Sequence, residues 1–128
     1  MASKKFSYGK DKLTFELAIR ILKDELDCHI GEEELKKIND SRSNVESIVE
    51  SGDKIYGVNT GIGTLCNTII SNEDSNLLQE NLLKSHAVGV GKNVPSEISK
   101  LMLILKVHSL CKGFSGIRIE VIERICWH

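Results

Sequence analysis

The segment that most constrains the fold is residues 96–113, which read SEISKLMLILKVHSLCKG. Its apolar side chains fall on nearly every face of a helix: Ile98, Leu101, Met102, Leu103, Ile104, Leu105, Val107 and Leu110. A helix that is apolar all round needs burial on all sides. A domain of 128 residues struggles to bury one helix completely, so we expect further protein around this one, from further chain or from other subunits.

Two helices are predicted from the first half of the chain, and they make the fold class mainly α. In residues 13–26 the apolar positions recur at helical spacing, with Thr14 as N-cap. Residues 32–51 begin with acidic side chains, as the helix dipole favours, and Gly52 ends this helix. The polar run 40–44 is a candidate break that would divide it in two.

The second half of the chain predicts three more helices. Residues 71–91 open on a capping box formed by Ser71 and Asp74, and Gly89 closes this helix. Pro95 opens the apolar helix from its first turn. The last predicted helix, residues 118–127, reaches the C-terminus without a cap, so we expect the chain to be a fragment of a longer protein. We expect one partial domain over residues 1–128, with residues 1–12 as a flexible terminus.

Composition limits where in the cell we expect the protein to be and which classes of partner we expect it to bind. The formal net charge is -1, which gives no electrostatic case for nucleic acid or for an anionic membrane. The chain has no apolar stretch of about 18 residues and no secretory signal at its start. The four cysteines form no C-x-x-C pair, so we read them as reduced thiols, mostly in the core, of a cytoplasmic protein. Cys28–His29, or Cys126 with His128, lacks standard zinc-ligand spacing, and we expect no metal.

The segment KIYGVNTGIGTL, residues 54–65, places Gly57, Gly61 and Gly63 beside Tyr56 and an amide side chain. Three interpretations are open. Glycine-rich backbone can cradle a phosphate, but this spacing matches neither common phosphate-binding motif. The glycines can serve a tight connection between helices. Finally, a tyrosine on a glycine-rich loop can act as acid or base if its pKa is lowered from about 10.

Two further segments change the balance between these interpretations. LLKSHAVGVG (82–91) and LKVHSLCKGFSGIR (105–118) follow YGVNTGIG (56–63) in the same order and at similar spacing as in a known family. Over roughly residues 13–126 the chain resembles the N-terminal part of the aromatic amino-acid ammonia-lyases, most closely the histidine ammonia-lyases. Three motifs in register are far more specific than any one of them.

The resemblance implies an aspartase/fumarase-like multihelical fold and a tetramer with active sites between subunits. The family eliminates ammonia from an amino acid; its histidine enzymes make urocanate, in histidine catabolism. The prosthetic group, 4-methylidene-imidazol-5-one (MIO), forms from an internal Ala-Ser-Gly. This chain has no such tripeptide: its only Ala-Ser, Ala2-Ser3, is followed by Lys4. We therefore expect no MIO and no activity in this chain alone.

Site residues are carried over from the family by position. Tyr56 corresponds to the loop tyrosine that acts as base or proton relay, and His86 to a residue lining the side-chain pocket. Ser85–His86 looks like the histidine-specific form of the selectivity pair, and Asn59 can orient a polar group of the substrate. Four residues shape the loop: Gly57, Thr60, Gly61 and Gly63. Ile62 stands where the family usually has Phe, which reshapes the loop.

Two other functions remain open on the sequence. The chain can be a non-catalytic helical module that retained the family surface and binds a partner. It can also belong to a lyase or aminomutase that acts on tyrosine or phenylalanine, if Ser85–His86 tolerates another ring.

Overall fold

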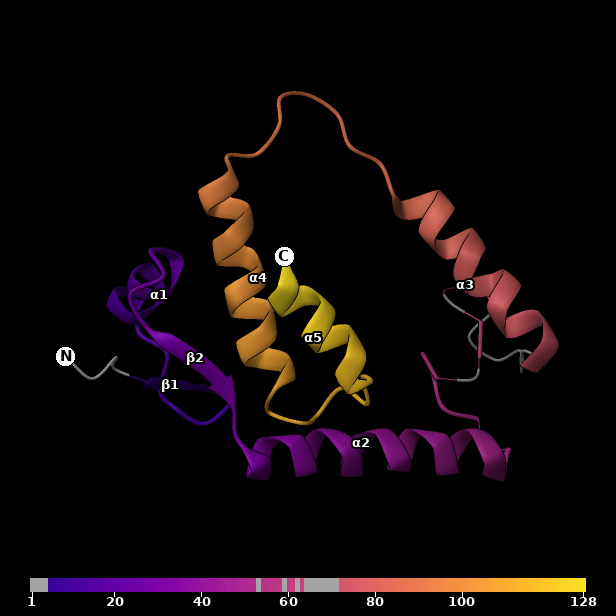
Figure 1. The fold of residues 1–128 in the computed structure, drawn as a ribbon. Helices are drawn as coiled ribbons and strands as arrows, with labels where there is room; N and C mark the ends of the chain where they lie inside the picture. The colour runs from indigo at the N-terminus through magenta and orange to yellow at the C-terminus, as the bar shows by residue number, and fades with distance from the viewer. Residues whose placement is uncertain (1–4, 53, 59, 62, 64–71) are drawn as a thin grey trace. The chain divides into compact units, whose positions relative to one another are not determined.

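The computed structural model describes residues 5–52, 54–58, 60–61, 63 and 72–128. Within these ranges the chain forms five helices and two strands. They are, in order, β1 (Lys5–Tyr8), α1 (Phe15–Leu22), β2 (Asp27–Ile30), α2 (Glu32–Ser51), α3 (Asn72–His86), α4 (Ser96–Leu110) and α5 (Ile119–Trp127) (Figure 1). The mainly helical fold class is thus confirmed. No helix in this described part is long and apolar enough to cross a membrane.

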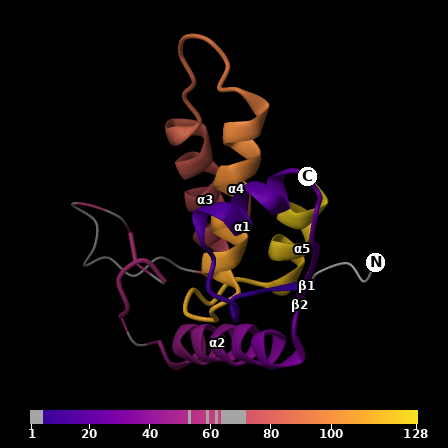
Figure 2. The same ribbon diagram turned by 90° about the vertical axis from the view of Figure 1, so that its left-hand side faces the viewer.

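The chain divides into two compact units. Unit 1 comprises residues 1–44 and 94–128, and unit 2 comprises residues 45–93. In unit 1, α4 lies between α1 and α5 and contacts both (Figures 1 and 2). One apolar core joins these helices to the strands and to α2; its buried members are Phe6, Tyr8, Ile21, Ile38, Ile104, Val107, Leu110, Cys111 and Ile122. The prediction of one partial domain stays a prediction.

Strands β1 and β2 form a parallel pair that the sequence did not predict. Phe6 lies opposite Cys28 and Tyr8 opposite Ile30, with α1 as the connection between the strands. Phe6 is only 2% exposed and meets the Tyr8 ring edge-on, with 5.5 Å between ring centroids. The prediction of a flexible terminus over residues 1–12 is therefore wrong for residues 5–8, because their apolar side chains are part of the core; residues 1–4 lie outside the described ranges.

The predicted helices are all present, with corrected ends. Thr14 is the N-cap of α1, and its Oγ1 accepts the Leu17 N–H at 3.3 Å. The candidate break at residues 40–44 is wrong, since α2 runs unbroken to Ser51 and ends before Gly52 at φ +75°. Helix α3 ends at His86, three residues before Gly89, which was predicted to close it. The capping serine predicted for α3 lies outside the described residues.

Two glycines of unit 1 allow backbones to touch. A Cβ on Gly9 (φ +82°) would lie 2.5 Å from the carbonyl oxygen of Cys111. A Cβ on Gly113 (φ +75°) would lie 2.7 Å from Cβ and 2.8 Å from the carbonyl carbon of Lys37. Because the obstacles include main chain, only glycine fits at either place. The segment after α4 is thereby held directly against α2.

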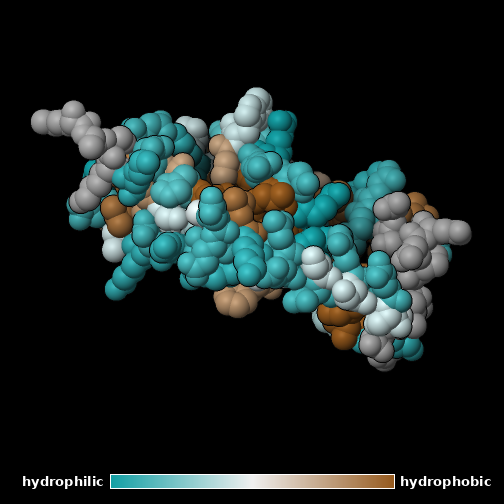
Figure 3. Space-filling view, turned by 60° about the horizontal axis from the view of Figure 1, so that its bottom comes forward, coloured by the Kyte–Doolittle hydropathy of each residue, from teal (hydrophilic) through white to brown (hydrophobic). Residues whose placement is uncertain are grey.

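Burial of α4 is one-sided within the described residues. Ile104, Val107 and Leu110 face the core, while Ile98, Met102 and Leu105 are 50%, 62% and 55% exposed. On the face of the molecule drawn in Figure 3, apolar side chains (brown) show between hydrophilic ones (teal). The expectation that this helix needs further protein around it agrees with this exposure, since single exposed apolar residues are common but a helical stripe of them is not.

Candidate functional site

The loop tyrosine lies in a turn of unit 2. The N–H of Val58 donates to the carbonyl of Ile55 at 3.1 Å, and this turn contains Tyr56 and Gly57. Gly57 has φ +78°, a left-handed conformation that costs a residue with a Cβ roughly 1–2 kcal/mol. Tyr56 is 64% exposed. The turn thus presents the phenol outward, where it can meet a ligand or another part of a larger protein.

The rest of the glycine-rich loop is only partly described. Thr60 is buried, and its hydroxyl donates to the carbonyl of Gly61 at 3.1 Å. Gly63 also has a positive φ, +65°, and a Cβ there would meet no atom within 4 Å. Asn59 and Ile62, two predicted determinants of the loop, lie outside the described residues. The described part is consistent with a loop-shaping role for Gly57 and Gly63, whose backbone angles favour glycine.

Ser85 and His86 occupy the last turn of α3, and both side chains are exposed. The Oγ of Ser85 lies 2.9 Å from Nδ1 of His86. Both atoms also approach the carbonyl oxygen of Leu82, Oγ at 3.0 Å and Nδ1 at 2.9 Å. This serine and histidine are therefore tied to the backbone of the last turn of α3.

The predicted site residues all belong to unit 2. Among those that the structure describes, no hydrogen bond joins Tyr56 to Ser85 or His86. All three are exposed, so each is available to a polar ligand. The arrangement offers a phenol, a hydroxyl and an imidazole, which are groups able to exchange protons and to bind a polar substrate.

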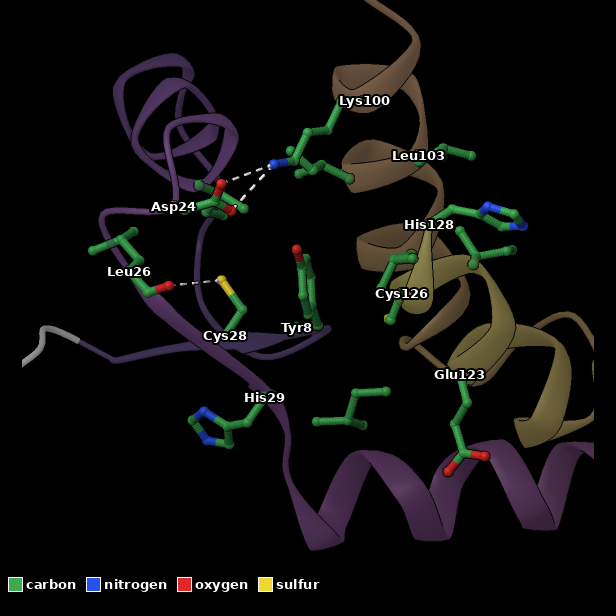
Figure 4. A pocket seen from close by; sticks show the side chains of 15 residues that line it. Tyr8, Asp24, Leu26, Cys28, His29, Lys100, Leu103, Glu123, Cys126 and His128 are labelled. Atoms are coloured by element: carbon green, nitrogen blue, oxygen red, sulfur yellow. Dashed lines mark hydrogen bonds and ion pairs between the residues drawn. The ribbon is translucent and has the colours of Figure 1, made fainter. Parts of the chain in front are cut away.

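A cavity of about 490 Å³ lies in unit 1, and the sequence did not predict it. Figure 4 shows the Tyr8 side chain inside it, with the hydroxyl directed towards an ion pair at its edge, Lys100 with Asp24. Both carboxylate oxygens of Asp24 lie 3.1 Å from Nζ of Lys100. Most of the apolar residues that line the cavity lie in helices that the sequence predicted. The sequence did not predict that β1 brings Tyr8 next to them.

The cysteines and histidines considered as zinc ligands in the sequence also line this cavity. Cys28, His29, Cys126 and His128 all line it. Within the described part of the chain, no group of three or more metal-ligating side chains is close enough to hold an ion. Burial raises the pKa of the Cys28 thiol, an effect that its hydrogen bond with Tyr8 partly offsets, and burial also raises the pKa of Cys126. Protonated thiols are poor nucleophiles, so this cavity offers packing rather than thiol chemistry.

Comparison with known proteins places the chain in a family. Residues 13–128 match the family model for aromatic amino acid lyase. The chain belongs to the aromatic amino acid lyase family. It is 41% identical over 115 residues to the histidine ammonia-lyase of Streptococcus pyogenes serotype M1, a match that covers 90% of this chain and 22% of the relative. The chain thus spans little more than a fifth of the length of the curated relatives that it matches.

Solved structures agree with the fold. Histidine ammonia-lyase from Trypanosoma cruzi matches with TM-score 0.82 and 31% identity, over 94% of this chain and 24% of that one. Tyrosine aminomutase from Streptomyces globisporus matches with TM-score 0.84 and 28% identity, over 96% of this chain and 23% of that one. The family and the fold follow from these likenesses, while the substrate differs among the proteins that share them.

Proposed function

We propose that this chain is the N-terminal segment of a histidine ammonia-lyase, which converts L-histidine to urocanate and ammonia. The observation that carries the proposal is the 41% identity to a histidine ammonia-lyase over 115 residues, a stretch that includes the Ser85–His86 pair. In the reaction the β-carbon loses a proton and the bond between Cα and nitrogen breaks. The histidine side chain is a polar ring with its own N–H group, which suits a pocket with a histidine in its wall.

The residues of this chain take two roles in the proposal. Tyr56 is the base or proton relay that handles the β-proton, and its exposure in unit 2 leaves its hydroxyl open to a substrate. His86, with Ser85 beside it, hydrogen-bonds the imidazole of the substrate. Asn59 orients a polar substrate group, while Gly57, Thr60, Gly61 and Gly63 shape the loop that carries Tyr56.

The MIO group of the family supplies an electrophile that activates the amino acid for elimination. The residues present here do not fit its formation, because the chain contains no Ala-Ser-Gly. We therefore assign the group, and the remaining catalytic residues, to the part of a full-length lyase that this chain does not span. The chain alone is then inactive, and the active form is a homotetramer of full-length subunits.

A chimeric enzyme tests the proposal. This chain replaces the corresponding first part of the histidine ammonia-lyase of Streptococcus pyogenes, and purified chimera is given histidine, tyrosine and phenylalanine separately. We expect urocanate, detected by its ultraviolet absorbance, and little product from the other two. Tyr56→Phe in the chimera should lower kcat about a hundredfold or more, the usual loss of a general acid–base group. The 128-residue chain alone should form no urocanate.

The chimera also separates the alternatives. A chimera that is tetrameric and processes tyrosine or phenylalanine in preference to histidine would transfer the proposal to the lyases and aminomutases for those substrates, which share the fold. An aminomutase would return an isomeric amino acid without net release of ammonia. A folded chimera that is inactive on all three would support a non-catalytic module. Urocanate made by the chain alone, and lost in Tyr56→Phe, would contradict the assignment of the remaining catalytic groups to another part.

A further inference from the structure

Three short contacts meet at the end of α3, around the carbonyl oxygen of Leu82. Nδ1 of His86 lies 2.9 Å from this oxygen, and Oγ of Ser85 lies 3.0 Å from it. Nδ1 and Oγ are themselves 2.9 Å apart. All three separations are within hydrogen-bond distance, so the protons between these atoms can be assigned from what each atom is able to do.

A carbonyl oxygen only accepts hydrogen bonds. Nδ1 of His86 must therefore carry a proton to bond with Leu82, because an unprotonated Nδ1 would place one lone pair against another. A neutral imidazole has one N–H, so its other nitrogen, Nε2, then has a free lone pair. We propose that the end of α3 holds neutral His86 as the Nδ1–H tautomer, with Nε2 as a hydrogen-bond acceptor for the ligand.

Ser85 acts in this arrangement as a positioning residue. Its hydroxyl donates to the carbonyl of Leu82, and its oxygen can share the proton on Nδ1 of His86. In the other tautomer the hydroxyl could still donate to Nδ1, but the contact with Leu82 would be repulsive. The serine therefore favours one rotation of the ring and, together with the carbonyl, one tautomer.

The assignment has a consequence for the ligand, which rests on the proposed function. An accepting Nε2 needs a donor, so the substrate side chain must offer N–H or O–H at that point. The imidazole of histidine offers N–H and the phenol of tyrosine offers O–H. The phenyl ring of phenylalanine offers neither, and binding it against Nε2 would leave that nitrogen without a hydrogen-bond partner. The tautomer thus disfavours phenylalanine before any question of shape arises.

Nitrogen NMR on the 128-residue chain tests the tautomer without substrate or activity. The histidines are labelled with ¹⁵N, the ring signals of His86 are identified by their loss in His86→Gln, and spectra are taken at a pH where their titration shows a neutral ring. We expect the Nδ1–H form of His86 to predominate. His108 is an internal control, because its Nδ1 accepts the Gly9 N–H at 3.2 Å and it must therefore show the opposite, Nε2–H form.

Two variants of the serine complete the test. Ser85→Ala should lower the ratio of the Nδ1–H to the Nε2–H form of His86 about fivefold, the worth of one net hydrogen bond. Ser85→Thr retains the hydroxyl and should restore the ratio, while His108 stays unchanged in both. A predominant Nε2–H form in the unmodified chain would overturn the proposal, and a ratio unmoved by Ser85→Ala would remove the positioning role. Neither result depends on the chimera, so this inference and the proposed function fail separately.

Discussion

Units 1 and 2 differ in what their described residues contribute: unit 1 contains the buried core, and unit 2 contains the predicted site residues. All members of the buried core belong to unit 1, from Phe6 on β1 to Ile122 on α5. The predicted site residues belong to unit 2, where Tyr56, Ser85 and His86 are exposed. In unit 2 the described part contributes no residue to the core. Among the described residues, the groups proposed for chemistry thus lie outside the buried core, as expected if the proposed active site is completed by other protein.

The glycines show the same contrast. In unit 1, a Cβ on Gly9 or Gly113 would collide with main chain, whereas in unit 2 a Cβ on Gly57 or Gly63 would meet no atom within 4 Å. All four have positive φ. The backbone angle is therefore the common cost of replacing any of them, and close packing adds a second cost only in unit 1. A glycine motif in a sequence does not tell these cases apart.

The largest expected effect comes from Gly113→Ala. The added Cβ must displace the main chain of Lys37, and the alanine must also keep the left-handed backbone conformation of this position. We therefore expect the free energy of unfolding to fall by about 3 kcal/mol or more. Urea unfolding followed by circular dichroism measures it. Gly57→Ala is the matched control: it meets the angular cost alone, about 1–2 kcal/mol, within unit 2. Equal losses in the two variants would show that close packing does not distinguish the units.

The helices were predictable from the sequence because their signals are local. Apolar spacing, the Thr14 cap and Gly52 each act within a turn or two, and the structure retains them. The helix 32–51 survived its polar run because a helix needs no apolar residue in every turn once its ends and one face are held. Two contacts fix one face of this helix. Ile38 is buried in the core, and Oγ of Ser41 accepts the Gly116 N–H at 3.0 Å.

The strands were not predictable, for the opposite reason. β1 has only four residues and pairs in parallel with β2 across the whole of α1, so its partner is remote in sequence. Its burial does not alternate either: Phe6, Ser7 and Tyr8 are all buried. A short strand covered on both faces lacks the period of two that identifies strands.

For the candidate site, the sequence supplied the residues and the structure supplied part of their surroundings. The family motifs selected Tyr56 and the Ser85–His86 pair, but no spacing predicts that His86 bonds back to the carbonyl of Leu82. That contact lies in the last turn of α3, which ends at His86, three residues before Gly89, the residue predicted to close the helix. Helix ends are the least certain feature of a periodic pattern, and here the end determines the chemistry of the side chain.

A smaller effect is expected from pH, and it acts on unit 1. Burial lowers the pKa of His108, the nearby Lys112 lowers it further, and Asp11 opposes this in part. The neutral ring is the form that accepts the Gly9 N–H. The folded chain thus binds the proton less well than the unfolded chain, whose histidine has a pKa of about 6.5. This contribution to stability is complete above that pH and is lost as pH falls through the lower pKa of the folded state.

Urea unfolding at several pH values between about 7.5 and 5.5 measures this contribution, above the range where ordinary carboxylates titrate. His108→Gln is the control, because its amide oxygen can accept the same N–H without titrating. The stability of this variant should change less over the interval than that of the unmodified chain. Identical pH profiles would mean that His108 does not couple protonation to the contact between α4 and Gly9.

The smallest expected effect concerns the ion pair between Asp24 and Lys100, at the edge of the cavity in unit 1. Its geometry is good, with both carboxylate oxygens 3.1 Å from Nζ, but the Asp24 side chain is 81% exposed. Water and salt screen such a pair, which usually contributes less than about 1 kcal/mol.

Asp24→Asn removes the charge of this pair without new backbone strain, because asparagine tolerates the φ of +57° found at this position. We expect a loss below about 0.5 kcal/mol in urea unfolding, and a smaller one still at high salt. A loss comparable to that of Gly113→Ala would show that unit 1 depends on its surface charges as much as on its close-packed interior.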